Sequence, residues 1–231
     1  MNYEVKEQLY EGKAKQVFAT NDPEIVMVHY KDDATAGDGE KKGTIRDKGI
    51  VNNKLSNALM QKLEKEGIPT HYVQEVNDRD TFVKKVEIVP LEVIVRNVAA
   101  GHFSLRMGVP EGKVFKTPIL EYSYKNDDLH DPFINHYYAL ALDLATQEEL
   151  DTIAKYAFKV NEVLKKIMLE PTYVWWTLSS SLAACPTARS FWPTRSAPTP
   201  AVSGTPPPAH IWTRICSAAT WAAKPTLTRK S

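Results

Sequence analysis

The acidic residues of this chain stop at Glu170, and this break limits how much of the chain can fold as one unit. All 28 Asp and Glu lie in residues 1–170, and residues 171–231 contain none. The same tail holds all five Trp, both Cys and nine of the 15 Pro. Globular enzymes carry acidic residues along their whole length. We therefore expect a folded body over residues 1–170 and a tail that does not continue its native fold.

Charge and length narrow the class of protein. A chain of 231 residues can form one large domain or two small lobes that share a cleft. The body carries 28 acidic and 23 basic residues, interspersed, so we expect no nucleic-acid partner. It has no apolar leader, no Cys and no run of the roughly 20 apolar residues that cross a membrane. These features predict a cytoplasmic protein without disulfides or a membrane partner.

Hydrophobic patterns in the first half predict a glycine hairpin, a third strand and a helix. Strand-like runs at residues 9–10 and 16–19 flank Gly12, and residues 25–30 are rich in strand-forming side chains. We expect residues 31–43 to form a polar loop. Residues 44–66 then show apolar side chains at helical spacing, which are Ile50, Leu55, Leu59 and Leu63.

The second half of the body predicts more strands and one long helix. We expect two strands around a turn at 77–78 and a buried central strand at 88–95. A short helix at 103–107, a loop at 110–118, a brief strand at 121–124 and a loop at 125–132 follow. Thr146 and Glu149 form a capping-box pattern, and the helix to about residue 169 has an apolar face of Leu150, Ile153, Ala157, Val160 and Leu164. Strands dominate early and the long helix comes late, so the predicted fold class is α+β.

Two polar segments near the N-terminus are candidates for binding an anion. In residues 11–15 a glycine turn lets backbone N–H groups approach phosphate oxygens, and Lys13 and Lys15 supply charge. The spacing is not that of a Walker A loop. Residues 31–42 suit a mobile loop that closes on an anionic ligand. Taken singly, each segment is better explained by a solvated surface turn or loop.

Two later segments are also candidate binding sites. Arg96 follows a buried strand and can hold a phosphate by two hydrogen bonds, and the small residues at 99–101 permit close approach of a ligand. A salt-bridged strand-end arginine explains Arg96 equally well. Residues 126–132 gather carboxylates around His130, as in a metal or amine site or in a solvated acidic turn. No second His stands at ligand spacing, so we expect no zinc there.

Together and in this order, these segments resemble the SAICAR synthetase family, the phosphoribosylaminoimidazole-succinocarboxamide synthases. The resemblance covers about residues 5–170, and its most specific part is Val95-Arg96-Asn97 followed by Ala99-Ala100-Gly101. It implies a two-lobed α+β fold with ATP in a cleft. The other matching segments are residues 10–15, 31–36, 39–42, 67–71, 89–94 and 125–132.

The resemblance also implies an ATP-dependent ligation of purine biosynthesis. ATP would phosphorylate the carboxylate of carboxyaminoimidazole ribonucleotide, because a carboxylate is a poor electrophile until one oxygen becomes a phosphate leaving group. The amine of L-aspartate would then displace that phosphate and give SAICAR. Family membership implies Mg²⁺ beside the ATP phosphates. The family often forms dimers or larger homo-oligomers.

The family's binding residues carry over to eleven positions. Those implied for ATP are Gly12, Lys13, Ala14 and Lys15 at the phosphates and Lys84, Val86 and Glu87 beside the adenine. Those implied for the ribonucleotide are Arg96 as the phosphate clamp, Gly101, His102 and Asp131. The family usually has Ser where this chain has His102, which still offers a donor to phosphate. The catalytic and metal-binding residues of the family lie beyond the long helix, and this chain has none of them.

The tail permits the missing family segments in a shifted reading frame. Trp175-Trp176-Thr177 must be encoded TGG TGG ACN, and translation from the third base gives Val-Asp. The next codons permit Phe-Lys-Leu-Glu-Phe, which completes the family strand that follows the long helix. Residues 191–205 and 212–223 permit two further family-like segments in the same frame. We therefore predict a frameshift near residues 171–173, in the gene or in the read, and a polypeptide of low or no activity.

This interpretation divides the chain into three parts. We expect an N-terminal ATP-binding lobe at 1–83, an incomplete substrate and ATP lobe at 84–170, and an aberrant tail at 171–231. The sequence is also compatible with two other functions. A small-molecule kinase would release ADP without aspartate, and a nucleotide-binding module would bind ATP without turnover.

Overall fold

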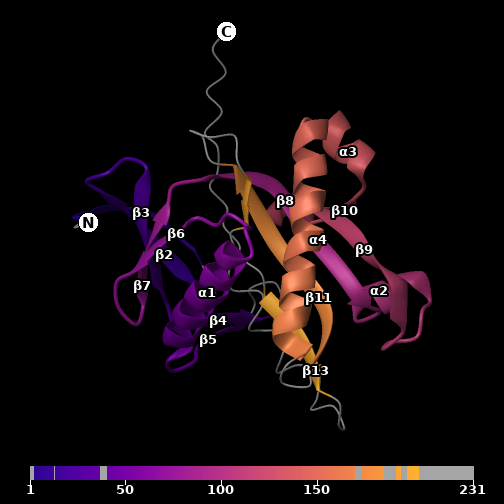
Figure 1. The fold of residues 1–231 in the computed structure, drawn as a ribbon. Helices are drawn as coiled ribbons and strands as arrows, with labels where there is room; N and C mark the ends of the chain where they lie inside the picture. The colour runs from indigo at the N-terminus through magenta and orange to yellow at the C-terminus, as the bar shows by residue number, and fades with distance from the viewer. Residues whose placement is uncertain are drawn as a thin grey trace.

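The computed structural model describes residues 3–12, 14–36, 41–169, 173–184, 191–193 and 197–202. Within these residues two antiparallel sheets, each with one long helix beside it, form the two halves of the body (Figure 1). This arrangement confirms the predicted α+β class and the two lobes.

The first sheet contains the predicted hairpin. Its five strands follow the order β1 (Val5–Glu11), β2 (Lys15–Thr20), β3 (Ile25–Tyr30), β7 (Asp80–Lys84) and β6 (Tyr72–Glu75). The hairpin, the third strand and the two strands around 77–78 are therefore confirmed. Side chains of this sheet form a small hydrophobic core, which consists of Val17, Val26, Val28, Tyr30 and Val83.

Helix α1 (Lys48–Lys65) packs against β3, β6 and β7, but its buried face is only partly the predicted one. Leu59 and Leu63 are buried as expected, whereas Leu55 is 38% exposed. Its N-terminal half instead buries amides, and Asn53 and Asn57 are fully buried. Their side chains bond to Thr81 of β7, so paired polar groups replace the apolar contact there.

The second sheet carries the predicted buried strand at its centre. Its path is β10 (Phe133–Ile134), β9 (Val114–Tyr124), β8 (Glu87–Val98), β11 (Tyr173–Ala184) and β12 (Phe191–Pro193), and β13 (Ala197–Val202) pairs with β11. The connections contain α2 (His102–Met107), the 3-10 turn η1 (Asp127–Leu129) and α3 (His136–Ala141). Leu91, Val93 and Val95 of β8 are fully buried.

The long helix α4 (Gln147–Leu169) covers one face of this sheet (Figure 1). Its capping box is confirmed, because Thr146 N donates to Glu149 Oε2 at 2.8 Å and Glu149 N donates to Thr146 Oγ1 at 3.3 Å. Its predicted apolar face is also confirmed, with all five side chains at most 1% exposed. They join Leu59, Leu63 and Ile68 in the larger core, so the end of α1 belongs to both halves.

Two predicted loops are wrong. Residues 31–43 contain most of a small hairpin of β4 (Asp33–Ala36) and β5 (Lys41–Thr44). This segment was predicted as a loop because its side chains are polar. Residues 110–118 are not all loop, because β9 begins at Val114 and contains Pro118. The register shifts between the Arg96–Ile119 and Val98–Val114 pairs, and such an irregularity admits a proline that cannot donate to the ladder.

Strand β11 lies in the tail and pairs antiparallel with β8, with Thr177 opposite Arg96. Residues 185–190, 194–196 and 203–231 lie outside the described part of the chain. The expectation that the tail lacks a native fold therefore stays a prediction. Among the described helices, none combines the length and the apolar character needed to cross a lipid bilayer.

Candidate functional site

The glycine hairpin is tied to the strand beside it. Gly12 N donates to Lys15 O at 2.8 Å and closes the turn, and Lys31 N donates to Ala14 O at 2.9 Å. Ala14 and Lys15 are buried, and Lys15 Nζ lies 4.7 Å from the ring centroid of Tyr30. Lys13 lies outside the described residues. The backbone of the turn is thus fixed at both of its ends.

Charges around the hairpin are paired. Lys31 Nζ lies 2.6 Å from Glu11 Oε1 and 2.6 Å from Asp33 Oδ2. The hydrogen bond from Lys31 lowers the pKa of Glu11 to about 2, and the two carboxylates raise the pKa of Lys31. Lys31 therefore links the end of β1 to the start of β4.

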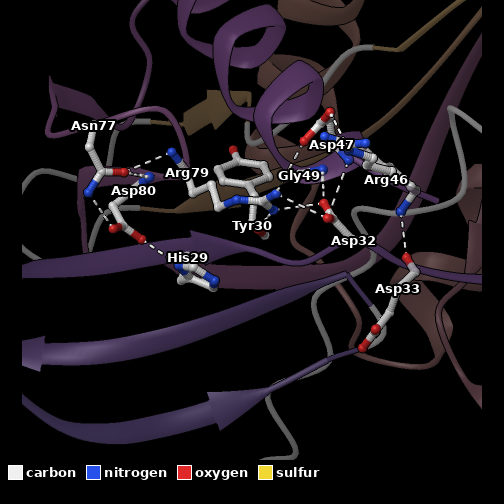
Figure 2. A network of polar contacts seen from close by, with 11 residues as sticks. His29, Tyr30, Asp32, Asp33, Arg46, Asp47, Gly49, Asn77, Arg79 and Asp80 are labelled. Carbon is white, nitrogen blue, oxygen red and sulfur yellow. Dashed lines mark hydrogen bonds and ion pairs between the residues drawn. The ribbon is translucent and has the colours of Figure 1, made fainter. Parts of the chain in front are cut away.

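A second polar network joins β3, the start of α1 and the turn between β6 and β7 (Figure 2). Arg79 donates from its two terminal nitrogens to both carboxylate oxygens of Asp32, at 2.7 and 3.0 Å. Asp32 also accepts from Gly49 N at 2.8 Å and from Asp47 N at 3.3 Å. These bonds, the one from Arg79 above all, hold the pKa of Asp32 well below its usual range.

Asp32 thereby caps a helix from a distance. Asp47, at the N-cap position of α1, has φ 61° and makes no capping bond with its own side chain. The carboxylate of Asp32 takes over this role and also faces the positive end of the helix dipole. A Cβ on Gly49 would lie 2.3 Å from the carbonyl oxygen of Tyr30, so glycine is required at this contact.

The residues predicted beside adenine form the link between the two sheets. Lys84 ends β7, where its N–H donates to His71 O at 2.7 Å, and Lys85 N donates to Glu24 O at 2.7 Å. Val86 is half-buried, and Glu87 is exposed at the start of β8. The predicted ATP residues thus occupy the hairpin of the first sheet and the connection to the second.

Arg96 lies within β8 rather than beyond its end, in a partly buried ion-pair cluster. Its Nε donates to Glu121 Oε2 at 2.5 Å, and the other oxygen of Glu121 accepts from Arg106 of α2. The side chains of Arg96 and Glu121 are only 11% and 12% exposed. The Arg96 guanidinium also lies over the ring of Phe103, 5.5 Å from its centroid. The predicted phosphate clamp is therefore also a salt-bridged arginine.

Strand alternation shows which face of the sheet this cluster occupies. Val93 and Val95 point into the core with α4, so Arg96 points to the opposite face. Glu121 pairs with Ile94 and is a diagonal neighbour of Arg96 on that same face. We call this the substrate face, defined by Arg96, Arg106 and Glu121.

Gly101 and His102 lead into the helix that carries Arg106. Gly101 has φ 56° and ψ −136°, a backbone conformation that favours glycine, and its N–H donates to Glu111 Oε1 at 3.0 Å. His102 is exposed at the first position of α2. Both residues thus come directly after the strand of Arg96 and before Phe103 of the cluster.

Asp131 lies just before β10, which pairs with β9 at the edge of the same sheet. Its Oδ1 accepts from Asn126 N at 2.8 Å, and its φ of 48° places it in the left-handed region. Two residues later, the ring of Phe133 lies 4.0 Å from the Arg106 guanidinium. The contact of Phe133 with Arg106 links the segment after Asp131 to the substrate face, and the role of Asp131 in binding the ribonucleotide stays a prediction.

Sequence reasoning missed Glu121, Arg106 and the Asp32–Arg79 pair. Glu121 was placed at the start of a brief strand, and only the true register of β9 brings it beside Arg96. In the described part of the chain no three His, Cys, Asp or Glu side chains form a group that could hold a metal. The tail from residue 171 adds no acidic residue to this set.

Comparisons with known proteins agree on one family. The family model of SAICAR synthetase matches residues 8–172. A phosphoribosylaminoimidazole-succinocarboxamide synthase of Lachnoclostridium phytofermentans is 61% identical over 160 residues, which are 69% of this chain and 68% of that protein.

Solved structures give the same result. The crystal structure of phosphoribosylaminoimidazole-succinocarboxamide synthase from Ehrlichia chaffeensis has a TM-score of 0.78 at 37% identity, and the match covers 83% of this chain and 81% of that one. A type-2 SAICAR synthetase in complex with ADP has a TM-score of 0.77 at 36% identity, over 84% of this chain and 80% of that one.

Proposed function

This chain belongs to the SAICAR synthetase family of ATP-dependent ligases in purine biosynthesis, and from that premise we propose that its substrates are ATP, carboxyaminoimidazole ribonucleotide and L-aspartate. The observation that carries the proposal is the 61% identity to a synthase of that name over 160 residues. The ADP bound to a similar structure supports the use of ATP.

The proposed reaction has two steps. A carboxylate oxygen of the ribonucleotide attacks the γ-phosphorus of ATP, and ADP leaves. The amine of L-aspartate then attacks the acyl carbon, loses a proton, and displaces phosphate together with the former carboxylate oxygen. Water must be kept from the acyl phosphate, because it would hydrolyse the intermediate.

We assign two groups of residues to binding. The hairpin residues Gly12, Lys13, Ala14 and Lys15 would bind the ATP phosphates, with positive charge from the two lysines, and the link of Lys84, Val86 and Glu87 would lie beside adenine. Arg96, Gly101, His102 and Asp131 would bind the ribonucleotide. The closed hairpin turn and the substrate face support this division. Mg²⁺ would arrive with ATP.

The tail belongs to the proposal as well. Strand β11 spans Tyr173–Ala184. In the shifted frame the codons of residues 175–177 give Val-Asp, and those that follow permit Phe-Lys-Leu-Glu-Phe. Acidic residues restored there would stand on the strand next to β8, since β11 pairs with it. We propose that the frameshift removes these carboxylates and lowers activity. Resequencing codons 165–180 tests this, and an unbroken read that gives the tail as written rejects it.

An isotope experiment tests the chemistry. The carboxylate of the ribonucleotide is labelled with ¹⁸O, and the reaction is run with a version of the chain whose tail is translated in the shifted frame. The proposal requires one labelled oxygen in each phosphate released. Phosphate without label contradicts the acyl phosphate. A kinase would release ADP without aspartate, and a binding module would give no ADP.

We also propose that the reaction takes place in the cytoplasm and that the enzyme is a homo-oligomer, as the family resemblance implies. Light scattering of the purified chain tests the second statement, and a monomer at all concentrations rejects it.

A further inference from the structure

The substrate face contains one carboxylate that the proposed reaction does not use. Glu121 accepts from Arg96 Nε with one oxygen, at 2.5 Å, and from Arg106 with the other. We propose that Glu121 is a positioning residue, which holds the Arg96 guanidinium in the orientation that binds the 5′-phosphate of the ribonucleotide. The inference rests on the proposed function, since it needs that ribonucleotide as the ligand.

The hydrogen-bond donors of Arg96 support this role. A guanidinium has five N–H donors in a planar fork, and Glu121 takes the one on Nε. Among the described residues no acceptor binds the two terminal nitrogens of Arg96. The two terminal nitrogens therefore keep four N–H donors, and the two of these that point along the outer edge have the geometry that binds two oxygens of a phosphate. Fixing Nε fixes the direction in which this edge points.

Aromatic rings restrict the cluster further. The ring of Phe103 is only 5% exposed and lies near both arginines, with its centroid 5.5 Å from Arg96 Cζ and 5.8 Å from Arg106 Cζ. The ring of Phe133 lies 4.0 Å from Arg106. The ring of Phe103 shields the Arg96–Glu121 pair, whose side chains are only 11% and 12% exposed, and hydrogen bonds to charged groups strengthen in such surroundings.

The charges explain why a carboxylate is needed at this position. Two arginines and one glutamate leave a net charge of +1, which attracts a phosphate without the repulsion of two bare guanidinium groups. Glutamine has the shape of glutamate but only one acceptor oxygen. Its amide nitrogen would face the N–H donors of one arginine. Glu121→Gln therefore releases Arg96 or Arg106, even where the fold is kept.

Calorimetry of the full chain tests the inference without requiring turnover. The ligands are SAICAR, the product with the phosphate, and its dephosphorylated riboside. The unmodified chain should bind SAICAR more tightly than the riboside. Glu121→Gln should weaken SAICAR binding about tenfold or more, as expected for a lost charged hydrogen bond, and leave the riboside unchanged. Glu121→Asp keeps the charge and should recover part of the loss.

Glu162→Gln is the matched control, because Glu162 is an exposed carboxylate on α4 for which no described residue is a partner. It should leave both affinities unchanged. Equal weakening of SAICAR and the riboside by Glu121→Gln would mean a merely structural role and would overturn the inference, and so would unchanged binding of both. If neither the chain as written nor the version with the shifted-frame tail binds either ligand, the proposed substrate is rejected, and this result needs no substitution.

Discussion

Arg79 and Asp32 form a two-bond ion pair, with N–O distances of 2.7 and 3.0 Å, that joins three separate parts of the first lobe. Asp32 follows β3, Arg79 precedes β7, and the carboxylate also accepts from the first turn of α1 at Gly49. The pair therefore orients α1 on its sheet. It also fixes the base of the β4–β5 hairpin, since Asp32 O accepts from Ile45 N at 3.0 Å.

The first prediction concerns acid stability. Because the folded-state pKa of Asp32 is lowered, its contribution is complete above the unfolded value of about 3.9. It is lost as the pH falls from there toward the folded pKa. Asp32→Asn should therefore flatten the decline in Tm between about pH 5 and pH 2. Asp128→Asn, which changes a carboxylate with no described partner, should leave the slope as it is.

The second prediction concerns the start of α1. Gly49→Ala places a methyl group 2.3 Å from the carbonyl oxygen of Tyr30 and should lower the free energy of unfolding by about 1–3 kcal/mol, the usual cost of overpacking. Gly43→Ala is the control, because a Cβ there meets nothing within 4 Å. Urea unfolding measures both. Equal stabilities of the two variants would contradict the close contact.

The third prediction concerns the buried amides beneath α1. The Thr81 hydroxyl donates to Asn53 Oδ1 at 2.6 Å and accepts from Asn57 Nδ2 at 2.8 Å. Thr81→Val keeps the shape and leaves both amides short of a partner, at a cost of about 1–3 kcal/mol. Thr81→Ser keeps the hydroxyl and should cost less. A serine variant less stable than the valine variant in urea would show that the methyl group matters more.

The fourth prediction separates the two groups of binding residues. Arg96→Gln should weaken SAICAR binding about tenfold or more and leave the affinity for a non-hydrolysable ATP analogue unchanged. Titration calorimetry gives both constants. A parallel loss of both affinities would mean that Arg96 supports the whole fold and not one ligand.

Much of the fold could be predicted from the sequence, because its signals are local. Three features show this: the hairpin at Gly12, the capping box at Thr146 and the apolar face around Ile153. In each of them the defining residues are close together in the sequence. The β4–β5 hairpin and the start of β9 were missed because polar side chains and Pro118 suggested loops. Leu55 was wrongly predicted on the buried face of α1. The spacing of apolar residues cannot reveal that hydrogen-bonded amides are buried on that face instead.

The candidate site could be predicted only in part, for a related reason. Arg96 and Gly101 stand in one short segment, and the family resemblance marks them directly. Glu121 is 25 residues from Arg96, and the contact depends on a strand register that shifts near Pro118. Arg79 is 47 residues from Asp32, with no periodic pattern between them. Long-range charged pairs of this kind leave no trace in a single sequence.

Product formation tests the central claim most directly. The chain as written and the version with the shifted-frame tail are each incubated with ATP, carboxyaminoimidazole ribonucleotide and Mg²⁺, with and without L-aspartate, and SAICAR and ADP are quantified. We predict equal amounts of SAICAR and ADP from the shifted-frame version, only when aspartate is present, and little or none from the chain as written. ADP released without aspartate, or no SAICAR from the shifted-frame version, would contradict the account.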